Sequence, residues 1–317
     1  MLDLDLFLHA YGKLYANQGS HTKGYKDEGI DGMSLKRIEK LINSLREGTF
    51  KWKPVRRVYI PKGGGKKRPL GIPSWNDKLV QEMIRVILEA YYEPQFSEHS
   101  HGFRQGKSCH SALEEVKRMK ATTWWIEGDI KGCFDNIDHS VLIGILKRSF
   151  HDGKFIKLIW SLLKSGYIED WRYNKTLSGT PQGGIVSPLL ANIMLNELDT
   201  KVESLMTKWN KGKVRKINPE WVRRKQNAYY HFKRGNVKKA KEQRKVALQL
   251  RSTDANDPTF RRLKYVRYAD DFLLGFIGSK AEAQEIKEEI GQCLSELGLE
   301  LSESKTLITH GKSERCR

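Results

Sequence analysis

The chain has 317 residues, with 57 Lys and Arg against 38 Asp and Glu, a formal net charge of +19. This balance favours a polyanionic partner, nucleic acid before an anionic membrane surface. No apolar run approaches the roughly 20 residues of a membrane span, and the acidic N-terminus lacks the basic start of a secretory signal. The widely spaced Cys109, Cys133, Cys293 and Cys316 predict reduced thiols in a cytoplasmic protein rather than a disulfide framework or a zinc site.

The first 120 residues combine helices with one basic hairpin. Helical spacing predicts helices over 1–17, 34–47, 76–90 and about 108–120. Ser34 and Asn76 are the expected N-caps of two of these helices. Residues 55–60 and 68–73 alternate as two strands around a glycine- and lysine-rich turn, which predicts a β-hairpin. Such a turn can wrap a phosphate chain, and a solvated basic hairpin is the alternative.

The middle of the chain carries an acid at a strand end and a glycine-rich turn. Residues 123–130 form an apolar strand-like stretch that contains Asp129, and helices are expected at about 139–149 and 154–165. A tight, glycine-rich turn at 179–184 then leads into a long helix from about 185 to 205. A glycine-rich entry to a helix N-terminus suits a nucleotide or the template backbone.

Residues 201–264 differ in composition from the rest of the chain. They hold 20 Lys and Arg against 5 Asp and Glu, together with seven aromatic or histidine side chains, and residues 236–250 are expected to form a basic helix. Such a charge run is usually a solvated face. Because phosphates attract the charge and unpaired bases stack on aromatic rings, we expect instead a basic insertion that grips structured RNA.

An acidic pair stands at the predicted tip of a second hairpin. Asp270 and Asp271 lie between a strand at 263–268 and an apolar strand at 272–277, and a helix at 281–297 and a closing strand follow. Two adjacent carboxylates repel each other unless their pKa values are raised or a hard divalent cation neutralises them. With Asp129 as the third acid, two strand ends would form a two-metal site for moving phosphoryl groups.

Three motifs carry a resemblance to a known family. Tyr-Ala-Asp-Asp at 268–271 resembles motif C of reverse transcriptases, Asp-Ile-Lys-Gly-Cys-Phe-Asp at 129–135 resembles motif A, and Gly-Thr-Pro-Gln-Gly-Gly-Ile-Val-Ser-Pro at 179–188 resembles motif B. Their wording is similar to that of the group II intron-encoded reverse transcriptases, or maturases. Ser-His-Gly-Phe-Arg at 100–104 likewise resembles a fingers motif of this family.

The resemblance implies an α+β fold with the fingers and palm of a right-hand polymerase, in which an antiparallel palm sheet is backed by helices. We expect fingers over 1–120, with 155–180 also in the fingers, and a palm over 121–317 that includes the basic insertion. The family continues with a helical thumb. We therefore expect a fragment that binds RNA but polymerises poorly alone, without a thumb or an endonuclease domain.

The resemblance also assigns site residues. Two Mg²⁺ ions, or Mn²⁺ as a substitute, are expected on Asp129, Asp270, Asp271 and the carbonyl of Ile130. The incoming dNTP is expected to meet Lys62, Arg68, Phe134, Gln182 and Lys305. In this scheme Phe134 is a steric gate against ribose, and Lys305 acts on the leaving pyrophosphate. Asp135 and Asp138 are interpreted as structural acids.

For RNA contacts we single out twelve cations of the basic insertion, namely Lys208, Lys211, Lys213, Arg215, Lys216, Arg223, Arg224, Lys225, Lys233, Arg234, Lys238 and Lys239. The predicted function is RNA-directed DNA synthesis, with group II intron RNA, an RNA template, a DNA primer and dNTPs as partners and no membrane. Two alternatives remain open. One is an RNA-binding splicing cofactor whose polymerase activity is dispensable, and the other is a reverse transcriptase of a retron or diversity-generating lineage. The oligomeric state is open.

Overall fold

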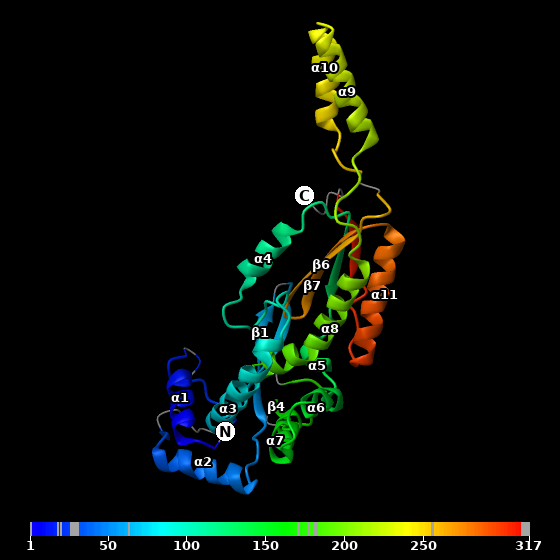
Figure 1. Ribbon diagram of the computed structural model, residues 1–317. Helices are drawn as coiled ribbons and strands as arrows, with labels where there is room; N and C mark the ends of the chain where they lie inside the picture. The colour runs from blue at the N-terminus through cyan, green and yellow to red at the C-terminus, as the bar shows by residue number, and fades with distance from the viewer. Residues whose placement is uncertain are drawn as a thin grey trace.

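The computed structural model describes residues 2–17, 19, 21–25, 32–62, 64–169, 172–176, 178–180, 183–254 and 257–311. The molecule is elongated (Figure 1): helices α1 to α3 lie at one end and the hairpin of α9 and α10 projects from the other. Two four-stranded sheets lie between these ends, in the orders β2-β1-β4-β5 and β6-β7-β3-β8. No helix in the described part of the chain is long and apolar enough to cross a membrane.

The first sheet is built around the basic hairpin. Strands β1 (Val55–Lys62) and β2 (Lys66–Ile72) pair antiparallel, as the alternating sequence predicts. Two short strands from far along the chain, β4 (Tyr167–Glu169) and β5 (Arg172–Asn174), extend this sheet through a parallel pairing of β4 with β1. Residues about 110 positions apart therefore share one sheet, and Arg57 stacks on the ring of Tyr167 at 3.3 Å.

Helices α1 (Leu4–Tyr15), α2 (Leu35–Glu47), α3 (Trp75–Tyr92) and α4 (Cys109–Arg118) occupy the N-terminal part. Ser34 caps α2 as expected, because its hydroxyl accepts from the backbone N–H of Arg37. The expected cap of α3 is wrong. Ser74 accepts from the N–H of Asp77, so the helix begins one residue before Asn76. The amide oxygen of Asn76 instead accepts from Nε of Arg37 at 3.0 Å.

The second sheet is antiparallel throughout. Its central strands β3 (Trp124–Asp129) and β7 (Asp271–Ile277) are flanked by β6 (Arg262–Tyr268) and by β8 (Leu307–His310). Helices α8 (Ser187–Trp209) and α11 (Lys280–Glu296) pack beside the sheet, and α4 packs on β6 from the other side (Figure 1). Helices thus lie on both sides of the sheet, while its edge strand β8 stays half-buried along its length.

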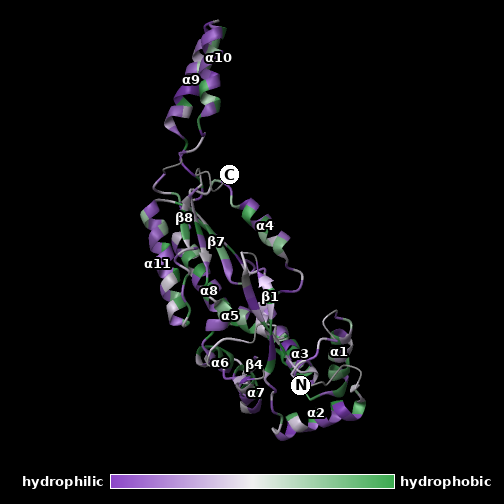
Figure 2. Ribbon diagram, turned by 180° about the vertical axis from the view of Figure 1, so that it is seen from behind, coloured by the Kyte–Doolittle hydropathy of each residue, from purple (hydrophilic) through white to green (hydrophobic). Residues whose placement is uncertain are grey.

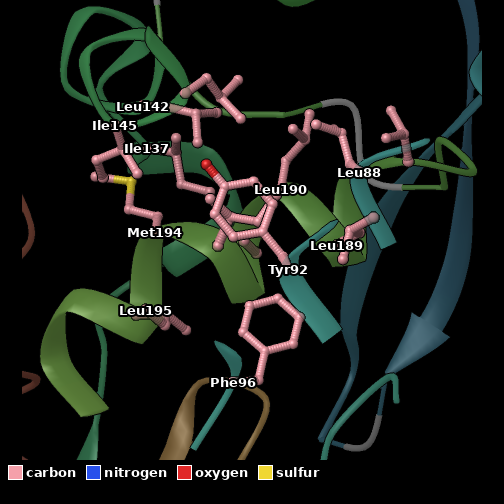
Figure 3. Packing of buried hydrophobic residues seen from close by; sticks show 14 of the residues in the cluster. Leu88, Tyr92, Phe96, Ile137, Leu142, Ile145, Leu189, Leu190, Met194 and Leu195 are labelled. Atoms are coloured by element: carbon pink, nitrogen blue, oxygen red, sulfur yellow. The ribbon is translucent and has the colours of Figure 1, made fainter. Parts of the chain in front are cut away.

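The core is centred on α8, which brings three parts of the chain together. Figure 3 shows Leu190 and Met194 of α8 among Leu88 and Tyr92 of α3, with Ile145 of α6 (His139–Lys147) nearby. Helices α6 and α7 (Gly153–Leu163) close this core, and the one-turn helix α5 (Cys133–Asn136) joins β3 to α6. One hydrophobic cluster therefore joins these helices to the second sheet.

The basic insertion folds as a helical hairpin. Helix α9 (Pro219–Lys233) was not expected from the sequence, whereas α10 (Val237–Gln249) was. Mostly hydrophilic, with a few apolar patches, the pair stands apart from the two sheets (Figure 2). Within these two helices only Ala240 and Ala247 are buried, so the hairpin has almost no core of its own.

Candidate active site

The two strands that carry the predicted acids lie side by side. In the antiparallel pairing of β3 with β7, Asp129 stands directly opposite Asp271. The third acid, Asp270, occupies the two-residue turn with Ala269 between β6 and β7. Ala269 adopts a positive φ of 57°, a region that favours glycine, so this turn is tightly constrained. Residues 142 positions apart in sequence thus meet at one end of the sheet.

The charges of the three acids affect one another. Partial desolvation, then the charges of Asp270 and Asp129, raise the pKa of Asp271 above its ordinary value, although the side chain still reaches water. Lys305 lies beside the acids: its ammonium donates to both carboxylate oxygens of Asp129 at 3.0 Å. That hydrogen bond raises the pKa of Lys305. Before Lys305 could act on pyrophosphate as expected, its ammonium would have to leave the carboxylate of Asp129.

The site supplies hard oxygen donors of the kind that divalent cations prefer. Among the described residues, no three His, Cys, Asp or Glu side chains converge as a ready-made metal cluster, and the carboxylate of Asp129 is bonded to Lys305. The backbone of Asp129 is fixed, since its carbonyl accepts from the N–H of Ser302 at 2.8 Å. The bridge between Ile130 and Leu301 uses the groups of their neighbours, so the Ile130 carbonyl is free of this pairing.

The turn that carries Asp270 is anchored by a buried network. Arg267, the third residue before Asp270, donates to the carbonyl of Ala269 at 2.7 Å and to the amide oxygen of Asn192 at 3.1 Å. The same guanidinium forms an ion pair with Asp199 at 2.6 Å. Asn192 and Asp199 both belong to α8, the helix that follows the glycine-rich turn. Helix α8 therefore positions the acidic turn, a role that the sequence analysis did not assign.

A second set of contacts ties the glycine-rich turn to the segment after Asp129. The N–H of Gly179 donates to the carbonyl of Ile137, and the N–H of Thr180 donates to that of Phe134, both at 2.8 Å. A Cβ on Gly179 would lie 2.6 Å from the Phe134 carbonyl oxygen, which explains the need for glycine there. The ring of His139 bonds the Gly179 carbonyl at 2.7 Å. Gln182 lies outside the described residues, so its expected contact with the nucleotide is untested.

Phe134 is half-buried and stands next to an exposed ring. Its ring and that of Phe103 meet edge to face, with centroids 6.2 Å apart. Phe103 is 55% exposed and has a positive φ of 57°. Phe103 belongs to the fingers motif, but the motif alone predicted no role for it. An aromatic residue between a glycine and an arginine does not by itself indicate a function, and it is the fold that brings Phe103 next to Phe134.

The two expected triphosphate contacts lie on one face of the basic hairpin. Arg68 stands opposite Ile60 and Lys66 stands opposite Lys62, so Lys62 and Arg68 are diagonal neighbours on the same side. Both are exposed. The hairpin also reaches the glycine-rich turn, because a Cβ on Gly183 would lie 2.7 Å from the carbonyl oxygen of Gly71. A cavity of about 370 Å³ lies between the hairpin and the segment from Ser178 to Thr180.

Asp138, one of the two acids interpreted as structural, has structural partners, and so do two histidines that contact α4. Asp138 caps α6 by accepting from the N–H groups of Ser140 and Val141, as expected of a structural acid. His99 and His101 both bond Glu115, so these histidines hold α4. The thiols of Cys109, Cys133 and Cys293 are free.

The twelve cations of the insertion differ in their surroundings. Lys208 is paired with Glu289 at 2.7 Å and Glu285 at 3.4 Å on α11. Arg224 links the two helices of the hairpin through Gln243 at 3.2 Å. Arg215 is half-buried, and burial lowers its pKa. The other nine, Lys211, Lys213, Lys216, Arg223, Lys225, Lys233, Arg234, Lys238 and Lys239, have exposed side chains.

Comparisons with known proteins identify the family to which the chain is similar. A family model described as reverse transcriptase (RNA-dependent DNA polymerase) matches residues 60–316. The group II intron-encoded protein LtrA of Lactococcus lactis subsp. cremoris is 48% identical over 98% of this chain and 53% of its own length. The putative COX1/OXI3 intron 1 protein of Saccharomyces cerevisiae is 41% identical over 98% of this chain and 37% of its own. The chain thus spans about half the length of LtrA, and less of the yeast protein.

A relative of more similar length and a solved structure complete the comparison. Protein YkfC of Escherichia coli is 34% identical over 93% of this chain and 74% of its own length. A telomerase from Candida albicans, solved with a fragment of telomeric RNA, superimposes with a TM-score of 0.52 at 13% identity, over 87% of this chain and 46% of that one. This likeness concerns the fold, and it confirms the predicted α+β architecture of fingers and palm. The chain therefore belongs to the reverse transcriptase (RNA-dependent DNA polymerase) family, in the branch of the group II intron-encoded proteins.

Proposed function

We propose that this chain is the polymerase part of a group II intron-encoded protein and adds dNTPs to the 3′-hydroxyl of a primer paired with RNA. One observation carries the proposal: Asp129 and Asp271 face each other across β3 and β7, beside Asp270 in the adjoining turn. In our assignment residues 1–120 and 155–180 are fingers, and the rest of residues 121–317 is palm.

The three acids and the Ile130 carbonyl would hold two Mg²⁺ ions, for which Mn²⁺ can substitute. Bound ions of this kind lower the pKa of the attacking hydroxyl and share the charge of the transition state. The constrained turn at Ala269 and the buried Arg267 keep the acids in place before substrate arrives. This preorganisation matters because phosphoryl transfer depends on positioning and charge rather than on covalent chemistry by the protein.

The incoming nucleotide would lie between the basic hairpin and the acids. Lys62 and Arg68, on one face of the hairpin, would bind its triphosphate, and Gln182 would contact the nucleotide or its template partner. Phe134 would exclude the ribose 2′-hydroxyl. Lys305 would leave Asp129 for the pyrophosphate, where an ammonium can donate a proton to the departing oxygen.

Single-nucleotide addition is the measurement that tests this proposal. It requires one catalytic event, which suits a chain that spans about half the length of LtrA. We expect Asp270→Asn and Asp271→Asn each to reduce addition by at least about a thousandfold with the fold retained. Addition that persists in both variants would disprove the assignment.

A second candidate function is that of a splicing cofactor for the intron RNA. The observation that favours it is the position of the basic insertion. The insertion joins the sheet at the start of β6, where Lys211 bridges to Arg261, whereas the acidic turn follows the end of this strand. Seven residues of strand span about 20 Å, so RNA can bind the insertion without entering the site. Asp270→Asn separates the two functions, because it is expected to abolish cDNA synthesis and leave splicing intact.

A further inference from the structure

The helical hairpin of the insertion contains a groove between two facing stripes. On α9 the stripe is Lys225, Ala228, Tyr229 and Phe232, and on α10 it is Val237, Ala240, Lys241 and Arg244. Both follow the spacing i, i+3, i+4 and i+7 that places residues on one face of a helix. Together they enclose a cavity of about 390 Å³, within the size range of small-ligand sites.

The aromatic side chains of this groove lack partners that would bury them. Tyr229 is 62% exposed and Phe232 is 65% exposed, and Val237 beside them is 47% exposed. A folded chain rarely leaves neighbouring large apolar side chains open to water unless something binds there. Since the hairpin projects from the body of the molecule (Figure 1), no other part of the chain that the structure describes covers the groove.

The charge around the groove indicates what binds. Residues 219–249 hold ten Lys and Arg against two Asp and Glu. Lys225, Lys241 and Arg244 line the groove itself, and their side chains are exposed. An apolar protein segment would gain nothing from three cations, whereas a nucleotide offers a flat base for the rings and a phosphate for the cations.

We propose that this groove captures an unpaired base of structured RNA between Tyr229 and Phe232, with Lys225, Lys241 and Arg244 at the adjoining phosphates. The inference rests on the proposed RNA-binding role of the insertion and makes it specific. A base held in a duplex already stacks on its neighbours and has no free face for a ring, so the groove selects a loop or a bulge. The site is more than the length of β6 away from the acidic turn, so the captured base is not the templating base.

The test compares two RNAs at fixed salt on the full chain. One is a hairpin with 2-aminopurine in its unpaired loop, and the other is a duplex of the same stem without a loop. We expect Tyr229→Ala with Phe232→Ala to weaken binding of the looped RNA by about tenfold to a hundredfold and that of the duplex by less than about twofold. The unchanged protein should quench 2-aminopurine, and the double variant should not.

The chain supplies a matched control and a rescue. Tyr230 is the next residue and is 50% exposed, but it does not line the groove, so Tyr230→Ala should retain the affinity for both RNAs. Tyr229→Phe keeps the ring and should bind like the parent. Circular dichroism of each variant excludes an effect that arises from loss of the helices.

Three results would overturn the inference: equal weakening of both RNAs by the double variant, no weakening of either, or a change in sedimentation with RNA affinity retained. The last result would identify a protein interface.

The double variant Lys238→Glu with Lys239→Glu, whose residues lie outside the groove, distinguishes failure of the base site from failure of RNA binding by the whole insertion. If this pair weakens both RNAs while the aromatic variant weakens neither, the groove is not a base site and RNA binding by the insertion stands. If neither variant weakens binding, that RNA-binding role fails as well.

Discussion

Arg267 and Asp199 form an ion pair with no exposed surface on either side chain, with Nη2 to Oδ2 at 2.6 Å and Nε to Oδ1 at 2.8 Å. Asp199 also accepts from the hydroxyl of Tyr265 at 2.7 Å, and Arg267 donates to Ser100 at 2.8 Å. The pair therefore joins α8, β6 and the fingers motif immediately behind the acidic turn.

Asp199→Ala should lower the free energy of unfolding by about 3–5 kcal/mol, because it leaves the Arg267 guanidinium buried without a counterion. Glu197→Ala is the matched control. Glu197 lies on the same helix and pairs with Arg148 at 2.9 Å, but these side chains are 33% and 64% exposed. It should cost less than about 1 kcal/mol. Equal losses of unfolding free energy in the two variants, measured by denaturant titration, would show that the buried ion pair contributes no more to stability than the exposed one.

Asp271→Asn should stabilise the chain at neutral pH in the absence of divalent cations. A carboxyl group with a raised pKa in the folded state binds its proton more tightly there, so the folded state loses stability as pH rises above the ordinary Asp value of about 3.9. The variant lacks this carboxyl group and therefore avoids the loss of stability. The gain in the free energy of unfolding should be at most about 1 kcal/mol, because water reaches the site. Unfolding curves should show the gain at pH 7 and none below about pH 3.9. A gain independent of pH would contradict the explanation.

Lys305→Ala should have two separable effects on nucleotide addition. Removing the ammonium from Asp129 frees that carboxylate, so less Mg²⁺ should give half-maximal rate. If Lys305 also protonates the leaving pyrophosphate, the maximal rate should fall by about a hundredfold. Lys131→Ala is the control, because Lys131 pairs with Glu300 at 3.5 Å on the exposed surface. A Mg²⁺ requirement that does not move would show that Lys305 does not compete for the site.

Phe134→Ala should relax discrimination against ribonucleotides by about tenfold or more, because the ring no longer blocks the 2′-hydroxyl. The measurement is the ratio of kcat/KM for a dNTP to that for the matching rNTP. Phe103→Ala removes the ring that packs edge to face on Phe134, with ring centroids 6.2 Å apart. It should lower the ratio less than Phe134→Ala does, because the Phe134 ring remains and only loses a neighbour. A larger effect of Phe103→Ala would move the gate to that residue.

Gly102→Ala should impair nucleotide addition by about a hundredfold, the cost of displacing a reacting group by about 1 Å. A Cβ there would lie 2.3 Å from the backbone nitrogen of Ala269, so the acidic turn must shift. Gly144→Ala in α6 is the comparison, because no atom lies within 4 Å of the added carbon. It should keep the activity and stabilise the helix by up to about 1 kcal/mol. Full activity of Gly102→Ala would show that the turn tolerates movement.

The strands and helices of the site were predictable because their signals are local. Apolar runs marked the strand before Asp129 and the strand after Asp270, and the structure places their ends together. Helix α9 was missed because charged residues are interspersed among its aromatic ones and none of its residues is buried, so no core-facing apolar stripe marks it in the sequence. In α1 the residues that pack are Phe7, Ala10 and Leu14, while Leu6 and Leu8 face water.

The contacts that organise the site could not be predicted from the sequence. The Arg267–Asp199 pair joins residues 68 positions apart, and no local pattern distinguishes Asp199 from the other acids of a helix. The bond from Lys305 to Asp129 likewise depends on how β8 returns beside β3. Such pairings follow from packing, which sequence periodicity does not encode.

The pairing of β3 has a consequence for biosynthesis. Both strands that flank it come much later in the chain, and Lys305 reaches Asp129 across 176 positions. During translation β3 leaves the ribosome with neither neighbour made, and the backbone N–H and C=O groups along its edges stay unpaired while the basic hairpin of α9 and α10 is synthesised. Contacts of such long sequence separation form slowly. The nascent polypeptide can therefore expose the surface that we propose for RNA before its acidic site is assembled.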